Sequence, residues 1–246
     1  MSIYVMSDIH GEEDLFHKML EQIHFSKSDT LYILGDVIDR GPDGIQILQE
    51  IRNTPNMIML LGSHEYMMLQ YYERTYSGLA IQSWNRYRNG HTASDFQKLS
   101  YSEQSAVLEF LRQLPSHITI DVGGISYYLV HGFPGDTIEE EVRIRPALHE
   151  RNPIAGTRLI IGHTPVLNLI VRREEQQDFM NLLAQRGEHP QILFAEGFID
   201  VDCGCSYCEP IKTLGCLRLD DFAEFYEYSR KNALTCLTKH IEKVSA

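Results

Sequence analysis

The sequence predicts a protein of the α/β class. In the first third of the chain, short apolar runs alternate with stretches whose apolar residues recur at helical spacing. After Pro115 the pattern changes to several short strands separated by turns that contain glycine. An alternating series of strands and helices favours a parallel sheet covered by helices. The 246 residues show no internal repeat or low-complexity linker, so we expect one domain over residues 1–246.

The first half of the chain is expected to begin with three buried strands separated by two helices. The helices follow from apolar residues three or four positions apart, such as Leu15, Met19 and Ile23. In chain order, the expected elements are the strand Ile3–Met6, the helix Glu12–Ile23, the strand Leu31–Leu34, the helix Gly44–Arg52 and the strand Met57–Leu61. Residues 64–114 are expected to be mostly helical, with a loop near residues 87–92.

The second half is expected to be richer in strands. Two alternating runs around Gly123 and Gly124 predict a hairpin. In chain order, the expected elements are the hairpin strands 118–122 and 126–130, a strand at 159–161, a helix after the charged stretch 172–177, and strands at 191–194, 197–201 and 213–219. We expect a polar helical tail to close the chain.

Composition excludes several classes of partner. The net charge is −12, which disfavours nucleic acid because binding to its backbone relies on clustered Lys and Arg. No apolar run approaches the roughly 18 residues of a membrane span, and the chain starts on a strand with no basic leader before it. We therefore expect no membrane association and a cytoplasmic location. The five cysteines cannot all pair, and we expect reduced thiols. The sequence does not set the oligomeric state.

Polar side chains gather directly after the ends of the predicted strands. The five blocks are Ser7-Asp8-Ile9-His10-Gly11, Gly35-Asp36-Val37-Ile38-Asp39-Arg40-Gly41, Gly62-Ser63-His64-Glu65, His131-Gly132 and Gly162-His163-Thr164-Pro165. Open α/β sheets bind ligands outside the carboxyl ends of their strands, so these loops are expected to converge at one edge. Each block alone is more often a turn or a helix cap. Five blocks that all follow strands favour a shared site.

Asp and neutral His are the ligands expected for Fe, Mn or Zn. Asp8 and His10 lie on one turn, Asp36 has two oxygens with which to bridge two ions, and His131 and His163 add imidazoles. Two cations roughly 3.5–4 Å apart can activate a shared water and stabilise a leaving oxygen. The pattern therefore predicts a dinuclear metal centre.

Two further groups fit the chemistry of phosphate esters. Arg40 offers a planar guanidinium suited to phosphate oxygens. His64, which we expect beside Asp39, can donate a proton to a departing alkoxide.

The five blocks resemble the signature of the calcineurin-like metallophosphoesterase superfamily, specifically its phosphoprotein phosphatase branch. That branch carries GDxHG, GDxxDRG, GNHE, HG and GH in this order, and the chain has SDIHG, GDVIDRG, GSHE, HG and GHTP between Asp8 and Pro165. The compact length is similar to that of bacterial and bacteriophage Ser/Thr phosphatases and of symmetrical diadenosine tetraphosphatases. The resemblance implies a four-layer α/β fold, with a central β-sandwich of two mixed sheets flanked by helices.

The resemblance also implies a role for each matching residue. Asp8 and His10 would bind the first metal, Asp36 would bridge, and His131 and His163 would bind the second metal with Ser63 at the position of the usual Asn. His64, oriented by Asp39, would be the general acid, and Arg40 would bind phosphate. A second phosphate-binding arginine is expected between the HG and GH blocks. Arg151 is the first choice, with Arg143 and Arg145 as rivals.

The activity implied is hydrolysis of phosphoserine and phosphothreonine monoesters by direct attack of a metal-bridging hydroxide. Two divalent ions are implied, with Mn²⁺ preferred and Fe or Zn as alternatives. The substrate would be a phosphoprotein or a nucleotide, because a symmetrical dinucleoside polyphosphate hydrolase would use the same motifs. An adenine pocket within residues 71–92 would favour the nucleotide.

Ser63 is the main departure from the related pattern, which has Asn there. Serine is shorter and its hydroxyl is a poorer ligand, so the second metal site is expected to be weaker. This departure keeps open a reading of another class, a catalytically weakened member that binds phosphate groups or partner proteins. Ser7 replaces the usual Gly, which we expect to be a modest backbone change.

Two other stretches carry minor expectations. Residues 89–92 resemble an Asn-Gly-Gly-x-Thr segment of related bacterial members, in which His91 would line the cleft or lie in a surface loop. The spacing of Cys203, Cys205, Cys208 and Cys216 is compatible with a structural zinc site. Buried cysteines in or near strands are the more common outcome.

Overall fold

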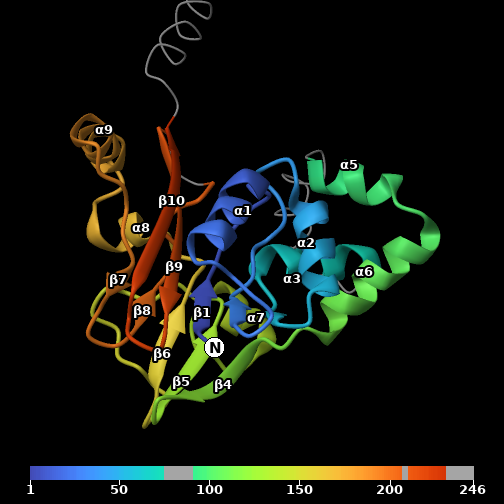
Figure 1. The fold of residues 1–246 in the computed structure, drawn as a ribbon, viewed down its shortest axis with the longest axis horizontal. Coiled ribbons are helices and arrows are strands. Elements are labelled where there is room, and N and C mark those ends of the chain that lie inside the picture. Colours follow the sequence, from blue (N-terminus) through green and yellow to red (C-terminus); the bar gives the residue numbers. More distant parts are fainter. Residues whose placement is uncertain (75–90, 207–209, 231–246) are drawn as a thin grey trace, which may run out of the picture.

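The computed structural model describes residues 1–74, 91–206 and 210–230, and it contains two five-stranded sheets (Figure 1). The first sheet has the strand order β10-β9-β1-β2-β3. Its strands are β1 (Ile3–Met6), β2 (Thr30–Ile33), β3 (Met57–Met59), β9 (Ile211–Arg218) and β10 (Glu224–Arg230). Strands β1, β2 and β3 are parallel, whereas β9 runs antiparallel to both β1 and β10. The first sheet is therefore mixed.

The second sheet is also mixed and has the order β4-β5-β6-β8-β7. Its strands are β4 (His117–Val122), β5 (Ile125–Val130), β6 (Arg158–Ile161), β7 (Leu193–Phe194) and β8 (Ile199–Asp200). Strands β4 and β5 form the predicted hairpin, turning at Gly123 and Gly124, both of which have positive φ. Strands β5, β6 and β8 are parallel, and β7 is antiparallel to β8.

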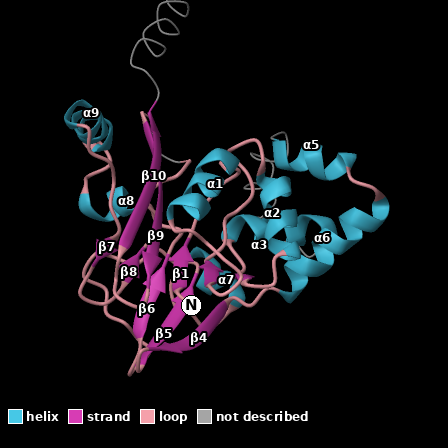
Figure 2. Cartoon of the chain, in the orientation of Figure 1, coloured by secondary structure: helices cyan, strands magenta, loops and turns pink. Residues whose placement is uncertain are grey.

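Helices flank the two sheets on both sides (Figures 1 and 2). They are α1 (Glu13–Gln22), α2 (Gly44–Asn53), α3 (Ser63–Glu73), α5 (His91–Lys98), α6 (Tyr101–Gln113), α7 (Ile138–Arg143), α8 (Val166–Ile170) and α9 (Gln176–Arg186). In Figure 1, α1, α2, α3, α5 and α6 lie on one side of the strands, and α8 and α9 lie on the other. Within the described ranges, no helix is long and apolar enough to cross a membrane.

The alternation of side chains along the strands explains why the sheets stack. In β1, Val5 points into the core between the sheets, whereas Tyr4 and Met6 pack in the cluster that contains the helices. In β5, Tyr127 points into the same central core, and Tyr128 points to the outer face. Because successive residues of a strand face opposite ways, each apolar strand contributes to two layers. The two mixed sheets with flanking helices confirm the predicted fold class.

The structure corrects three details of the expected element order. A polar helical tail was expected after residue 219, but residues 224–230 form β10 because they pair with β9 and Phe225 packs against Tyr4; residues 231–246 lie outside the described part. Residues 91 and 92 were expected in a loop, but they open α5; residues 87–90 lie outside the described part. Helices α7 and α8 were not anticipated, although Thr137 and Glu140 form a capping box at the start of α7.

Candidate metal centre

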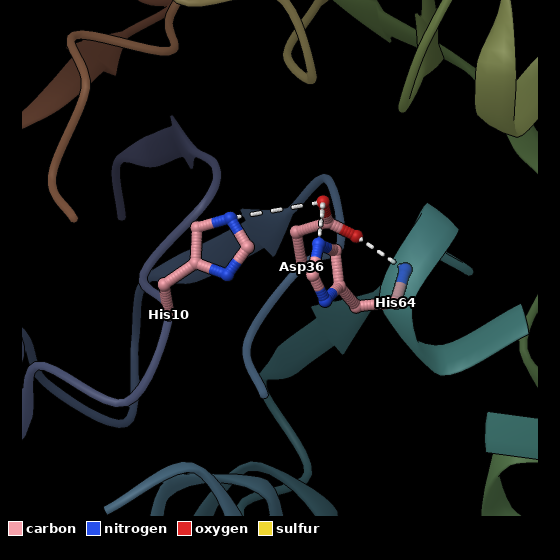
Figure 3. A group of neighbouring side chains, drawn as sticks. All are labelled: His10, Asp36 and His64. Atoms are coloured by element: carbon pink, nitrogen blue, oxygen red, sulfur yellow. Dashed lines mark hydrogen bonds and ion pairs between the residues drawn. The ribbon is translucent and has the colours of Figure 1, made fainter. Parts of the chain in front are cut away.

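The loops that follow β1, β2, β3 and β5 meet at the carboxylate of Asp36. His10 Nε2 lies 3.8 Å from Asp36 Oδ2, and His131 Nε2 lies 3.3 Å from Asp36 Oδ1. The backbone N–H of His64, in the first turn of α3, donates to Asp36 Oδ1 at 2.8 Å. Figure 3 shows His10 approaching Asp36 from a loop and His64 approaching it from the start of a helix. The carboxylate is 1% exposed, so it lies at the buried centre of the cluster.

The rings of His10 and His131 are both held in place through Nδ1. The Nδ1 of His10 bonds the carbonyl of Ile38 at 2.9 Å, and the Nδ1 of His131 bonds the carbonyl of Leu34 at 2.7 Å. A ring nitrogen that faces a carbonyl must carry a proton, so the lone pair of the neutral ring lies on Nε2. Burial lowers the pKa of His131, but Asp36 outweighs it and raises this pKa to about 9, so a cation at His131 Nε2 would take the place of a proton. Both Nε2 atoms are buried and make no hydrogen bond to the described residues. An unsatisfied acceptor beside a buried carboxylate fits a cation.

Two sets of candidate ligand atoms share Asp36. The ligand atoms of His10, Asp36 and His64 lie within 4.8 Å of one another, and so do those of Asp36, His131 and His163. The imidazole rings of His131 and His163 are 4.9 Å apart. Burial and the positive charges of His131 and Arg145 keep the pKa of His163 well below its ordinary value. His163 is therefore neutral, the form in which it can bind a metal.

Asp8 is fixed from two sides. Its Oδ2 accepts hydrogen bonds from Ser7 Oγ at 2.5 Å and from the His163 N–H at 2.9 Å. Its Oδ1 faces His10 Nε2 at 3.7 Å. Gly162 is needed here, because a Cβ on it would lie 2.1 Å from Ser7 Oγ. Ser7, which the sequence suggested was only a backbone change, thus contacts a candidate ligand and leaves Asp8 Oδ1 facing the cluster.

Ser63 contacts the same carboxylate as the histidines. Its hydroxyl lies 3.1 Å from Asp36 Oδ2 and 3.3 Å from Asp36 Oδ1, and the residue is 6% exposed. Burial would raise the pKa of Asp36, but His131 and His64 outweigh it and hold this pKa well below its ordinary value. The hydroxyl of Ser63 is therefore committed as a donor to an ionised carboxylate.

Glu65 supports the Asp36 loop, although the motif analysis gave it no role. Its carboxylate accepts the backbone N–H groups of Asp36, Val37 and Ile38 at 2.9, 2.9 and 3.1 Å. Burial and the nearby Asp36 raise the pKa of Glu65 to about 7, and the hydrogen bond from the Ile38 N–H opposes this shift. Its position directly after Ser63-His64, within the GSHE block, was the available signal.

His64 and Asp39 form the predicted pair. His64 Nδ1 lies 2.7 Å from Asp39 Oδ2, and both residues are buried. His64 Nε2 lies 3.9 Å from Asp36 Oδ2, on the side of the candidate metal ligands. Burial would lower the pKa of His64, but the charges of Asp36 and Asp39 outweigh it, so this pKa is raised. The imidazole is thus held with a proton available beside the cluster.

The backbone at the site is strained. Asp8, His10, Asp36, Asp39, Arg40 and His163 all have positive φ, between 49° and 69°. Residues other than glycine rarely adopt this conformation, and clusters of such residues occur at active sites and ligand clamps. The loops after three strands therefore adopt a costly shape that brings their side chains together.

The candidate phosphate-binding arginines occupy different places. Arg40 is exposed and adjoins Asp39. The charge of Arg145 contributes to the lowered pKa of His163, so Arg145 lies near the cluster. Arg143 lies at the end of α7, 3.5 Å from Glu139. The Cα of Arg151 packs beside Gly197, where a Cβ would lie within 2.8 Å of it. The effect of its charge on the pKa of His163 thus favours Arg145 among the three, and Arg151 stays a prediction.

The cysteines stand apart from the candidate metal ligands. Cys203, Cys205 and Cys216 are free and buried, and Cys208 lies outside the described residues. Within the part of the chain that the structure describes, the groups suited to a metal ion consist of His and Asp alone. The zinc alternative therefore has no support from the three described thiols.

Three known proteins illustrate what the chain is similar to. It is 33% identical over 138 residues to serine/threonine-protein phosphatase 2 of Escherichia coli (strain K12), a match that covers 54% of this chain and 59% of that protein. It is 29% identical over 175 residues to a symmetrical bis(5'-nucleosyl)-tetraphosphatase of Acidovorax ebreus (strain TPSY), covering 68% and 58%. These matches span less than two thirds of either relative. A protein serine/threonine phosphatase from Saccharomyces cerevisiae shares the fold, with a TM-score of 0.58, 14% identity, and coverage of 94% of this chain and 80% of that one.

The family assignment rests on a longer match. The model of the calcineurin-like phosphoesterase family matches residues 1–198, which contain every strand-end block described above. The match covers most of the 246 residues, and the two mixed sheets agree with it. The chain belongs to the calcineurin-like phosphoesterase family.

Proposed function

We propose that this chain is a metal-dependent phosphoesterase that hydrolyses phosphoserine and phosphothreonine monoesters. The observation that carries the proposal is the pair of buried nitrogens, His10 Nε2 and His131 Nε2, that face opposite oxygens of Asp36. Such an arrangement suits two cations that share one carboxylate. The adjacent pair of His64 and Asp39 supplies a proton donor at the same place.

The residues that would hold the two ions follow from this geometry. Asp8, His10 and Asp36 would hold one ion, and Asp36, His131 and His163 would hold the other, with Ser63 beside the shared carboxylate. Bound divalent ions would supply the positive charge that activates water and stabilises the transferring phosphoryl group. Mn²⁺ is the preferred ion, with Fe or Zn as alternatives that these ligand types also accept.

The chain's own residues would position the ester and manage the proton. Asp39 accepts from His64 Nδ1, so His64 Nε2 is the nitrogen left to protonate the departing alkoxide. Burial lowers the pKa of His64, but Asp36 and Asp39 outweigh it and raise this pKa above its ordinary value. His64 therefore keeps its second proton at a higher pH than a free histidine does. Arg40 would bind phosphate oxygens, and Arg145 is a stronger candidate than Arg151 for the second guanidinium.

A symmetrical dinucleoside polyphosphate hydrolase is the second candidate. It is favoured by the similarity to the Acidovorax protein, whose matched region covers 68% of this chain. Residues 75–90, most of the stretch in which an adenine pocket was expected, lie outside the described part. For either function, we propose a cytoplasmic location and a single domain over residues 1–246.

The deciding experiment compares a phosphoserine peptide with diadenosine tetraphosphate on one preparation whose metal content is measured. We expect two divalent ions per chain, faster turnover of the peptide, and loss of peptide turnover in His64→Ala. Faster turnover of the dinucleotide would favour the second candidate, with a different substrate but the same metal-dependent hydrolysis. Bound phosphate without turnover of either compound would instead support a member that only binds phosphate groups or partners.

A further inference from the structure

A residue of α5 holds the turn that carries Asp39. Asp39 and Arg40 each have φ of 69°, in the left-handed region that these residue types rarely adopt. The Asp39 N–H donates to Thr92 Oγ1 at 2.8 Å. Thr92 is 1% exposed and Asp39 is 3% exposed, so water does not compete for this contact. A strained turn after β2 is thus tied to a helix 53 positions further along the chain.

The Thr92 contact completes the set of bonds that fix this loop. Glu65 accepts the N–H groups of Asp36, Val37 and Ile38, and this series stops one residue before Asp39. Thr92 takes the next N–H in the series. Because the backbone of Asp39 sets the direction of its carboxylate, the same contact determines how Oδ2 meets His64 Nδ1 at 2.7 Å.

Helix α5 is itself anchored to the helix that begins with Ser63 and His64. The ring of Phe96 in α5 lies 4.8 Å from the ring of Tyr72 in α3, and Phe96 is 1% exposed. Thr92 and Phe96 are four residues apart and therefore lie on one face of α5. Helix α5 thus contacts both the turn that carries Asp39 and the helix that carries His64.

We propose that Thr92 is a positioning residue that holds the Asp39 carboxylate against His64. The proposal rests on the proposed phosphoesterase function, through the role of His64 as proton donor. Loss of the Thr92 oxygen leaves the buried Asp39 N–H without its acceptor, so the turn relaxes and His64 loses its fixed orientation. Thr92 itself does not touch the reacting atoms.

The kinetic test compares Thr92→Val, which keeps the side-chain shape but removes the oxygen, with Thr92→Ser, which keeps the oxygen. A phosphoserine peptide has a poor leaving group that needs a proton, whereas p-nitrophenyl phosphate has a good one. General acid catalysis raises the reaction rate roughly 10²–10⁴-fold, and a partly misplaced His64 should lose part of this rate enhancement. We expect Thr92→Val to lose about 10- to 100-fold in kcat on the peptide and less than about threefold on p-nitrophenyl phosphate.

Thr92→Ser should restore the activity on the peptide. Thr54→Val is the matched control, because the Thr54 hydroxyl donates to the Glu50 carbonyl at 2.8 Å, at the end of α2. It should leave both substrates unaffected. An equal loss on the two substrates in Thr92→Val, or no loss on either, would overturn the proposal.

A second measurement is independent of turnover. The Nδ1 proton of His64, bonded to Asp39, should give a downfield NMR signal in the protein and in Thr92→Ser, and this signal should shift or vanish in Thr92→Val. If neither substrate is hydrolysed by the unchanged protein, the proposed function fails while the NMR comparison still decides the role of Thr92. A folded Thr92→Ser that loses the signal, or a Thr92→Val that keeps it unchanged, would contradict the positioning role.

Discussion

Two serine hydroxyls bond the carboxylates at the centre of the site, Ser7 to Asp8 and Ser63 to Asp36. The related motif pattern has Gly and Asn at these positions. A hydroxyl that donates to a carboxylate oxygen competes with a cation for the same lone pair. An Asn side chain at position 63 would instead offer an amide oxygen as an additional ligand. At both positions the chain thus places a hydrogen-bond donor to a carboxylate, and at position 63 it lacks the additional candidate ligand of the related pattern.

Replacing Ser63 by Asn should strengthen the second metal site. The added amide oxygen would serve as a ligand and the hydroxyl donor to Asp36 would be lost, so we expect metal affinity there to rise roughly tenfold. Turnover should rise with occupancy. Isothermal titration with Mn²⁺ and elemental analysis on the same sample measure both effects. Unchanged affinity and unchanged turnover would show that Ser63 does not limit this site.

Replacing Glu65 by Gln should destabilise the fold by about 1–3 kcal/mol, because the amide NH₂ cannot accept one of the three buried N–H groups that Glu65 now binds. Denaturant unfolding measures the change. Glu73→Gln on the same helix is the matched control, because Glu73 is 31% exposed and pairs only at the surface with Arg112. The control should cost less than about 1 kcal/mol. If both substitutions lowered the free energy of unfolding equally, the proposed role of Glu65 in holding the Asp36 loop would be contradicted.

At the scale of elements, the sequence predicted the strands better than the short helices. Strands β1, β2 and β3 were predictable because their apolar runs are buried between helices and the second sheet. Strand β10 was predicted wrongly because its composition is polar and only part of it is covered. Pairing with β9 along seven positions determines its conformation, and this is a long-range effect that local pattern does not contain. Helix α7 was missed despite its Thr137 and Glu140 cap.

The contact between α1 and α2 gives a dependence of stability on pH. His17 Nε2 lies 2.8 Å from Glu50 Oε2, and the hydrogen bond to Glu50 raises the pKa of His17 above its ordinary 6.5. A raised folded-state pKa means that the contribution is fully present below about pH 6.5 and is lost as the pH rises through the folded value. His17 is 45% exposed, so solvent screening limits its contribution.

We therefore expect His17→Ala to lower the free energy of unfolding by a few tenths of a kcal/mol at about pH 5.5 and to have almost no effect at about pH 9. Urea unfolding at the two pH values measures the difference. Glu50→Gln should remove the same dependence. A larger loss at about pH 9 than at about pH 5.5 would contradict the assigned ion pair.

At the scale of the whole molecule, the site joins the two sheets. Asp8 and Asp36 follow strands of the first sheet, and His131 and His163 follow strands of the second. The sequence predicted that these loops converge, because each block follows a strand end, but it placed them at one sheet edge, whereas they come from both sheets. It did not predict Ser7, Glu65 or Thr92 as contacts, because each acts through a backbone group or a neighbouring carboxylate. Such contacts leave no motif of their own.

Metal binding should therefore stabilise the sandwich as a whole. An ion that binds only the folded state at 100 times its dissociation constant adds about 2.7 kcal/mol. We expect Mn²⁺ to raise the melting temperature relative to protein treated with a chelator, and His131→Ala to lose most of this rise. Measuring the melting temperature and the metal content of the same samples tests this prediction. Bound ions without any change in melting would contradict a site that links the sheets.

The bond between His131 Nδ1 and the carbonyl of Leu34, at 2.7 Å, joins residues 97 positions apart. During synthesis the amino-terminal part of the chain emerges first. A nascent chain that has extended only to Gln113 already carries Asp8, His10, Asp36 and His64 but lacks both imidazoles of the second sheet. In such a chain, Asp8 and Asp36 would lack their contacts with His131 and His163. Under the proposed function, the site for two ions therefore cannot be complete until translation has passed His163.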